Sequence, residues 1–341
     1  MKRILLIFAV FTISLGLCSC ALPDTPQTAE TVDDVFSLPT EDQAPLETEP
    51  VRVSMSGISS YGYLDGAEDD AGVYYLYEGG EMSIPLRLSV MGLEEEGVGL
   101  VLFLDGQPQA YHTDFDETDR YMHTVYPHDL VADRVELRFI PRTGTVGDVK
   151  TIDFLMVPFP GQESRDGGTP ARFIGLKRGI VSRLVYEADP PEPQAVPVTE
   201  CVLHCSAQYR DLTSDEIALW SSENYQTMVE AEFSAEDMVA YGTRTDFDGE
   251  TVNFRLVLKG APDAEYALTV FVNDQPVTVS PEQIIRTTTE NGQKLVVDMV
   301  LDVSDLTDHF SVYAMLSPTV YRNEGWDDNF VSGYFFFERK E

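Results

Sequence analysis

The 341-residue chain has few cysteines, few basic residues and none of the common catalytic motifs. Only 4 cysteines occur, and two of them lie in the N-terminal segment, which excludes a dense disulfide framework. Lysine and arginine total 23 against 58 acidic residues, and the net charge of -35 excludes nucleic acid as a partner. No G-x-S-x-G, H-E-x-x-H, S-x-x-K or C-x-x-C motif and no phosphate-binding loop is present. We therefore expect a protein that is not an enzyme and that needs no cofactor or metal.

The N-terminus has the order of an export signal. Two basic residues, Lys2 and Arg3, precede an apolar run over residues 4–17, which is too short to cross a bilayer comfortably. The run ends in Leu17-Cys18-Ser19-Cys20, which resembles the lipobox of bacterial lipoproteins: an aliphatic residue, two smaller ones and a cysteine. The resemblance implies that residues 1–19 are a signal peptide and that Cys20 is acylated and holds the chain on a lipid bilayer. The alternative is an ordinary signal peptide, cleaved nearby, with release of a soluble protein.

Residues 20–50 have the composition of a tether. Ala21 to Pro50 contains five prolines, eight acidic residues and no lysine or arginine. Such a segment cannot bury enough apolar surface to offset the entropy lost on ordering, so it is predicted to be disordered. Its role would be to hold the folded part away from the membrane.

Strand patterns begin after residue 51. Apolar and polar residues alternate in 84–90, 100–104 and 252–258, and this period of two indicates half-buried strands. Turn signals separate the strands at short intervals, and Asp105-Gly106 and Asn273-Asp274 predict hairpin turns. The pattern predicts an all-β chain of immunoglobulin-like antiparallel β-sandwiches.

The two halves of the strand-rich region repeat each other with an offset of 168 residues. Ile84-Pro-Leu-Arg-Leu88 aligns with Val252-Asn-Phe-Arg-Leu256, and 102–108 aligns with 270–276 without a gap. This internal repeat predicts two tandem sandwich domains, 51–189 and 198–341. Between them, the prolines of 190–197 form a stiff connector.

A few short helices are expected in the second domain, at 213–222, at 234–241 and at the capping box Ser280-Pro-Glu-Gln283. Near the C-terminus, Tyr334-Phe-Phe-Phe337 is apolar without alternation, which indicates burial on both faces. We favour a strand inside its own sandwich. The alternative is that one face of this strand packs on the other domain.

Cys201, His204 and Cys205 are the first of two clusters with metal-binding residue types. On a strand the two sulfurs would share a face ~13 Å apart, and His204 would point to the other face. That separation is too large for one zinc ion, so two buried free thiols are the favoured interpretation.

His112, Asp114, Asp116 and His123 form the second cluster. Oxygen-rich loops of this kind can hold calcium. A solvated hairpin loop in an acidic protein is the favoured interpretation.

Trp326 lies in a polar loop between two predicted strands, Tyr321-Arg-Asn-Glu-Gly-Trp-Asp-Asp-Asn329. Together with Tyr321, Asp327 and Asp328 it is the candidate site for a ligand or partner, because an exposed indole beside carboxylates can hold a sugar or a cationic side chain. The alternative is that Trp326 folds under the loop as a plug. A second aromatic cluster consists of Tyr61, Tyr63, Tyr74, Tyr75 and Tyr77.

The sequence thus predicts an exported, membrane-anchored lipoprotein that acts as a binding or structural module of the cell envelope. Its expected partners are the bilayer, through acylated Cys20, and an envelope protein or a glycan. A carbohydrate-binding surface lipoprotein of a polysaccharide uptake system is the first alternative. An envelope hydrolase is the second, although no convincing set of catalytic residues supports it.

Overall fold

The computed structural model divides the chain into two units, Met1–Val51 and Arg52–Glu341. All residues that the structure describes lie in the second unit: 59–64, 67–69, 72–91, 97–130, 134–158, 181–192, 196, 198, 201–219, 229–235, 244–260, 265–277, 286–288, 292–320, 330–332 and 335–340. The predicted signal peptide, Cys20 and the predicted disordered tether fall outside them. None of the helices in the described residues is long and apolar enough to span a membrane.

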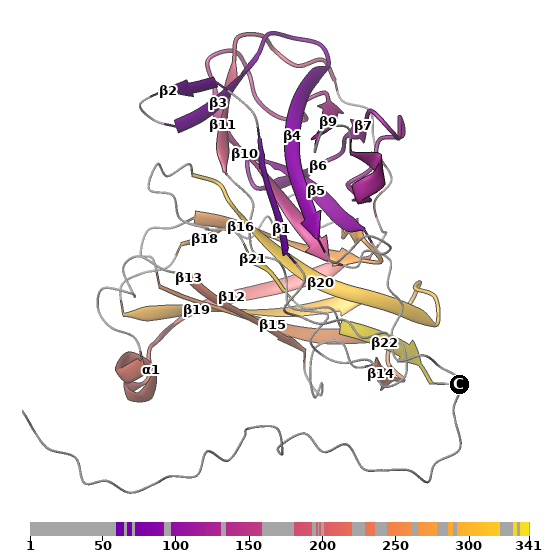
Figure 1. Ribbon diagram of the computed structural model, residues 1–341. Helices are drawn as coiled ribbons and strands as arrows, with labels where there is room; N and C mark the ends of the chain where they lie inside the picture. Colours follow the sequence, from indigo (N-terminus) through magenta and orange to yellow (C-terminus); the bar gives the residue numbers. More distant parts are fainter. Residues whose placement is uncertain are drawn as a thin grey trace, which may run out of the picture. The chain divides into compact units, whose positions relative to one another are not determined.

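The first sandwich has two sheets (Figure 1). In spatial order, its first sheet contains β1 (Ser59–Leu64), β4 (Met82–Met91), β9 (Arg134–Phe139) and β7 (His112–Thr113). Its second sheet contains β2 (Ala67–Asp69), β3 (Gly72–Tyr77), β11 (Ser182–Tyr186), β10 (Val149–Pro158), β5 (Val98–Leu104) and β6 (Gln107–Gln109), with β8 (Met122–Val125) also on β5. A short 3-10 helix, η3 (Pro127–Asp129), follows β8.

The second sandwich also has two sheets. The first contains β12 (Leu203–Asp211), β19 (Gln293–Asp302), β15 (Thr251–Gly260) and β13 (Val229–Ala235). The second contains β14 (Arg244–Phe247), β22 (Phe335–Arg339), β20 (His309–Pro318), β16 (Glu265–Val272) and β17 (Gln275–Pro276), with β18 (Arg286–Thr288) on β16 and β21 (Phe330–Val331) on β20.

The two sandwiches share one strand order. The path β3-β11-β10-β5-β6 of the first corresponds to β14-β22-β20-β16-β17 of the second, and β1-β4-β9 corresponds to β13-β15-β19. In each sandwich one described pair is parallel, β3 with β11 and β14 with β22, and the other pairs are antiparallel. This is the order of an immunoglobulin-like fold. The predicted fold class, two all-β immunoglobulin-like sandwiches in tandem, is therefore confirmed.

The fourth strand of the first sheet differs between the halves. In the first sandwich this place is taken by β7, which pairs with β9 at only two positions and comes from the loop between β6 and β8. In the second it is taken by β12, which precedes the rest of the sandwich in sequence and pairs with β19 at nine positions. The internal repeat therefore does not extend to this edge.

Local sequence explains the repeated β5–β6 and β16–β17 hairpins. Both residues of each turn have positive φ: 52° at Asp105 and 73° at Gly106, 48° at Asn273 and 63° at Asp274. This is the type I′ turn that Asn, Asp and Gly favour between two strands, because its twist matches that of the strands. The hairpins were predicted from these turn residues.

Only one of the predicted helices is seen among the described residues. α1 (Ser214–Leu219) falls within the predicted range 213–222 and begins with a capping box, in which Thr213 N–H donates to Glu216 Oε2 at 2.9 Å. The prediction of a helix starting at Ser234 was wrong, because Ser234 lies near the end of β13 and pairs with Arg255. The rest of that range, 236–241, and the capping box at 280–283 lie outside the described residues.

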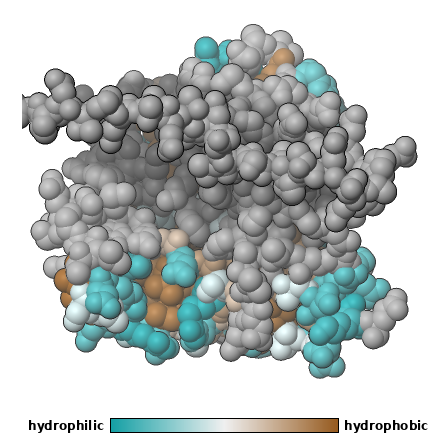
Figure 2. All heavy atoms as spheres, turned by 60° about the horizontal axis from the view of Figure 1, so that its bottom comes forward, coloured by the Kyte–Doolittle hydropathy of each residue, from teal (hydrophilic) through white to brown (hydrophobic). Residues whose placement is uncertain are grey.

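Each sandwich encloses its own apolar core. In β15 the side chains alternate between exposed and buried over Thr251–Leu256, as the period of two predicted. The sheet that carries β15, with β12, β13 and β19, is drawn at the bottom of Figure 1, and the view from that side shows hydrophilic and apolar surface interspersed (Figure 2). An Arg255–Asp298 ion pair, with Nε and Oδ1 2.6 Å apart, crosses this sheet. A mixed surface is typical of a sheet face in contact with water.

A third apolar cluster joins the two sandwiches. It contains Val101, Phe103, Leu155 and Val157 of the first sandwich and Phe271, Tyr313, Met315 and Phe336 of the second. We call it the interface cluster. It corrects our interpretation of the C-terminal strand: Phe335 and Phe337 pack in the core of the second sandwich, but Phe336 between them belongs to the interface cluster. β22 does lie inside its sheet, between β14 and β20, and its other face packs on the first sandwich.

Candidate functional site

The two sandwiches meet through corresponding sheets. The interface cluster comes from β5 and β10 on one side and from β16, β20 and β22 on the other. Two hydrogen bonds flank it: Thr151 Oγ1 donates to the carbonyl oxygen of Pro318 at 3.0 Å, and Ser317 Oγ donates to Asp153 Oδ2 at 3.2 Å. Apolar packing with satisfied polar groups holds this face of each sheet in a defined position.

The β5–β6 turn packs directly against the second sandwich. A Cβ atom on Gly106 would lie 2.6 Å from Cβ of Ala267 and 2.8 Å from Cγ2 of Thr319. Gly106 also has a positive φ, so its lack of a side chain serves both the turn and the close approach. The turn therefore places β6 at the edge of the interface, beside β16.

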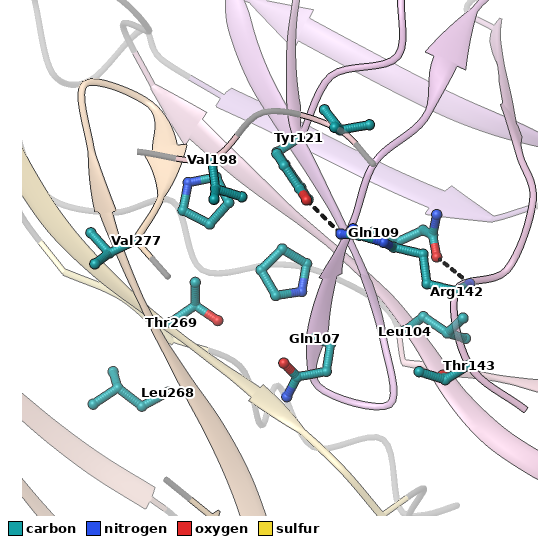
Figure 3. Close-up of a pocket in the computed structure, with 13 residues that line it drawn as sticks. Leu104, Gln107, Gln109, Tyr121, Arg142, Thr143, Val198, Leu268, Thr269 and Val277 are labelled. Atoms are coloured by element: carbon teal, nitrogen blue, oxygen red, sulfur yellow. Dashed lines mark hydrogen bonds between the residues drawn. The ribbon is translucent and has the colours of Figure 1, made fainter. Parts of the chain in front are cut away.

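A cavity of about 590 Å³ lies at this edge (Figure 3). We call it the interface cavity. The first sandwich contributes one wall, the second contributes the facing wall, and two valines of the intervening segment complete the lining. The lining residues are Leu104, Gln107, Pro108, Gln109, Tyr121, Arg142, Thr143, Val196, Val198, Leu268, Thr269, Pro276 and Val277.

Gln109 fixes the wall on the side of the first sandwich. Its side chain is only 2% exposed, and its Nε2 donates to the carbonyl oxygens of Ala110 at 2.7 Å and Ile140 at 3.2 Å. Its Oε1 accepts from the backbone N–H of Arg142 at 3.0 Å. One buried amide thus ties β6 to the start of the β9–β10 loop, which carries Arg142.

Arg142 brings a positive charge to the cavity. Its Nη1 donates to the hydroxyl of Tyr121 at 2.5 Å, and its Cζ lies 5.4 Å from the centre of the Tyr121 ring. In the described part of the chain its guanidinium has no carboxylate partner, although acidic residues outnumber basic ones by more than two to one in this protein. Figure 3 shows Arg142, Tyr121 and Gln109 grouped on one wall, with Val277, Leu268 and Thr269 on the facing wall.

The lining has few groups that could carry out chemistry. Among the described residues that line it, the titratable side chains are Tyr121 and Arg142, and Ser, Cys, His, Asp and Glu do not occur. The described part of the lining thus offers neither a hydroxyl beside a general base nor a carboxylate pair. The described lining residues offer one cation and several apolar surfaces, a composition typical of small-molecule sites.

None of the site residues predicted from the sequence is among the described residues that line this cavity. Trp326, Tyr321, Asp327 and Asp328 lie outside the described residues, as does Cys20. Of the second aromatic cluster, Tyr75 and Tyr77 are buried in the core of the first sandwich, and Tyr74 lies beneath the guanidinium of Arg183, 5.6 Å from its Cζ. Tyr61 and Tyr63 fall on β1.

Both cysteines of this pair are free thiols, as predicted, but the predicted full burial holds for Cys201 only. Cys201 is buried and Cys205 is half-buried, and both pack against the core of the second sandwich. Burial raises the pKa of each thiol to about 11. Within the described residues, no group of three or more His, Cys, Asp and Glu side chains is placed to hold a metal ion.

The segment from His112 on β7 to His123 on β8 contains a loop whose carboxylates bind its own chain. Asp114 Oδ1 accepts from the N–H of Glu136 at 3.3 Å, and Asp119 Oδ1 lies 2.9 Å from His112 Nδ1. His123 is 2% exposed, with Nε2 2.8 Å from the carbonyl oxygen of Tyr111. Burial lowers the pKa of His123.

Comparisons with known proteins assign no family. No family model matches the chain, and no curated protein matches it. Among solved structures, the N-terminal Ig1-2 module of the Drosophila receptor protein tyrosine phosphatase DLAR is 12% identical, with 83% of this chain and 99% of that chain covered and a TM-score of 0.20. A marsupial T cell receptor is 9% identical, with 81% and 100% covered and a TM-score of 0.19. TM-scores this low do not establish a shared fold, so the assignment of the fold rests on the strand order.

Proposed function

We propose that this protein is an exported, lipid-anchored binding module of the cell envelope that holds a small ligand in the interface cavity. The observation that carries the proposal is the cavity itself. Its size of about 590 Å³ lies within the range of small-molecule sites, which occur preferentially where domains meet. The lining is mostly apolar with a small number of fixed polar groups, as such sites usually are.

A binding role also fits the residues of the cavity better than catalysis does. Among the described residues that line it, the hydroxyls of Thr143, Thr269 and Tyr121 are accompanied by no His, Asp, Glu or Lys that could act as a general base. A carbohydrate ligand, our first alternative, is poorly suited to it. Sugars are commonly held on an open aromatic face beside carboxylates, whereas the described lining residues offer one aromatic ring, Tyr121, which is 2% exposed. A glycan would have to bind elsewhere, and the loop of Trp326 stays the predicted place for it.

The anchor can be tested by labelling the expressed protein with an alkyne fatty acid and separating membrane from soluble fractions. We expect Cys20→Ser to abolish labelling and Cys18→Ser, the matched control, to leave it intact. Equal labelling of wild type and Cys20→Ser would refute acylation at Cys20.

The cavity can be tested with a panel of small soluble molecules, by ligand-detected NMR. Val198→Trp places a large side chain on the cavity lining, and Val300→Trp places the same side chain at a position on β19 that is 37% exposed and does not line the cavity. A molecule that binds the wild type and Val300→Trp but not Val198→Trp occupies the cavity. If no molecule in the panel separates the two variants, the proposed ligand site is wrong.

A further inference from the structure

We infer that the ligand of the interface cavity is a small apolar molecule with one carboxylate, and that the carboxylate binds Arg142. This inference deepens the proposed function and depends on it. It follows from the position of Arg142, from the charge of the chain and from a difference between the two halves of the repeat.

The guanidinium of Arg142 is fixed in position and has N–H donors available for an anion. A guanidinium has five N–H donors in a planar fork that matches a carboxylate. The bond to Tyr121 uses one of them, and the backbone bond to Gln109 fixes the start of the side chain. A carboxylate at the remaining donors would complete the pattern of a bidentate pair, which is stronger than a neutral hydrogen bond.

The charge of the protein limits the ligand to a low charge. The chain has a net charge of -35, so its field repels anions in general. One arginine compensates one negative charge. A polyanion such as a nucleotide would bring charges that no other described side chain of the lining compensates, since Arg142 is the only cation among those residues. A single carboxylate satisfies both conditions.

The internal repeat shows that the two facing walls of the cavity differ in polarity. Pro108 on β6 and Pro276 beside Val277 are equivalent by the offset of 168, and both line the cavity. The next pair is Gln109 and Val277: the first half has a buried amide that positions Arg142, and the second half has a buried valine. The same scaffold position is thus polar on one wall and apolar on the facing wall.

The apolar wall determines the other end of the ligand. Leu268 and Val277 of the second sandwich, with Val196 and Val198 of the connecting segment, provide aliphatic surface across from Arg142. An apolar body placed there would leave water, and its carboxylate would reach Arg142. A neutral apolar molecule would leave the guanidinium without an anionic partner, and a sugar would leave its hydroxyl groups against aliphatic carbon.

The test compares two probes of the same shape, 4-phenylbutyrate and 4-phenylbutyramide, which differ in charge. Calorimetric titration of the full chain should give an affinity at least about tenfold higher for the carboxylate, because hydrogen bonds to charged groups are the stronger ones. In Arg142→Gln the two affinities should become equal, and in Arg142→Lys a preference for the carboxylate should persist. Titration of Val198→Trp with the same probes measures any binding outside the cavity.

Each other outcome overturns the inference. Equal affinities in the wild type would show that the cavity does not select a carboxylate, and would leave the proposed binding function standing. A preference that survives in Arg142→Gln would show that another group binds the carboxylate. If neither probe binds the wild type beyond Val198→Trp, this ligand class is wrong, and the wider panel decides whether the cavity binds anything. Melting temperatures within 2–3 °C of wild type, roughly the shift caused by 1 kcal/mol, confirm that the Arg142 variants are folded.

Discussion

Phe103 and Phe271 occupy equivalent positions in the two halves of the repeat, and their rings contact each other edge to face with centroids 6.5 Å apart. In a symmetric dimer, a residue on the twofold axis contacts its own copy in the partner. Leu155 and Met315, which also occupy equivalent register positions, belong to the same cluster. The two sandwiches are therefore packed like the halves of a dimer joined in one chain. This arrangement uses one face of each second sheet for internal contact and leaves a cavity at its edge.

The first prediction concerns this pair. Both rings are fully buried, so Phe103→Ala or Phe271→Ala should each lower the free energy of unfolding by about 3–5 kcal/mol. Because the rings contact each other, the free energy of unfolding should fall by less in the double variant than the sum of the decreases in the two single variants. Urea unfolding measures these values. Phe115→Ala, at a side chain that is 37% exposed, is the control and should change stability by no more than about 0.5 kcal/mol. Strict additivity would show that the pair is not coupled.

The strands could be predicted because their information is local. Alternation in 84–90 and 252–258 identifies the buried face of each strand, and the turn residues at Asp105 and Asn273 identify the hairpins. The interface could not be predicted in this way. The apolar run around Phe336 is compatible with burial in its own sandwich and with packing on the other one. Only the packing of the two sheets decides that Phe336 faces the other sandwich. A helix pattern at Ser234 was overridden by pairing with β15.

The cavity residues gave no signal of their own in the sequence. Gln109 and Arg142 are 33 residues apart, and it is the hydrogen bond between them that defines the wall. One clue was available: the repeat conserves Pro108 and Pro276 but replaces Gln109 with Val277. A difference of this kind between equivalent positions can mark a site that one half has specialised.

The second prediction concerns His123 and pH. Burial lowers the pKa of His123 in the folded chain below the ordinary value of about 6.5, while the carbonyl of Tyr111 and Asp116 oppose this shift, and Arg120 and His112 add to it. The unfolded chain then binds a proton more readily, so the contribution of His123 to stability is complete above about pH 6.5 and is lost as the pH falls below it. His123→Gln should flatten the loss of stability between pH 7 and pH 5, measured by urea unfolding. His128→Gln, at an exposed side chain, should not. An unchanged pH profile in His123→Gln would contradict the assignment.

The third prediction concerns the two thiols. Burial raises the pKa of Cys201 and Cys205 to about 11, so very little of either is the reactive thiolate at pH 8. Alkylation of the native protein by iodoacetamide should be slow at both positions, and urea should accelerate it strongly. Peptide mass spectrometry separates the two sites. Rapid labelling of Cys201 without denaturant would show that its core environment opens readily.

The last prediction concerns Trp326, whose loop lies outside the described residues. If the loop binds a glycan or an envelope protein, the indole is exposed, and Trp326→Ala should weaken that binding by ~2 kcal/mol or more while changing the melting temperature little. If Trp326 is a plug, its removal opens a cavity, and the melting temperature should fall by many degrees. A glycan array and a pull-down from native envelopes measure the first quantity, and thermal unfolding measures the second. Asp328→Asn is the matched variant: it leaves the indole in place and removes one charge. Binding to glycan that survives in Trp326→Ala would rule the loop out as the recognition surface. Because the interface cavity is poorly suited to sugars, retained glycan binding would then have to be sought on other loops of the two sandwiches.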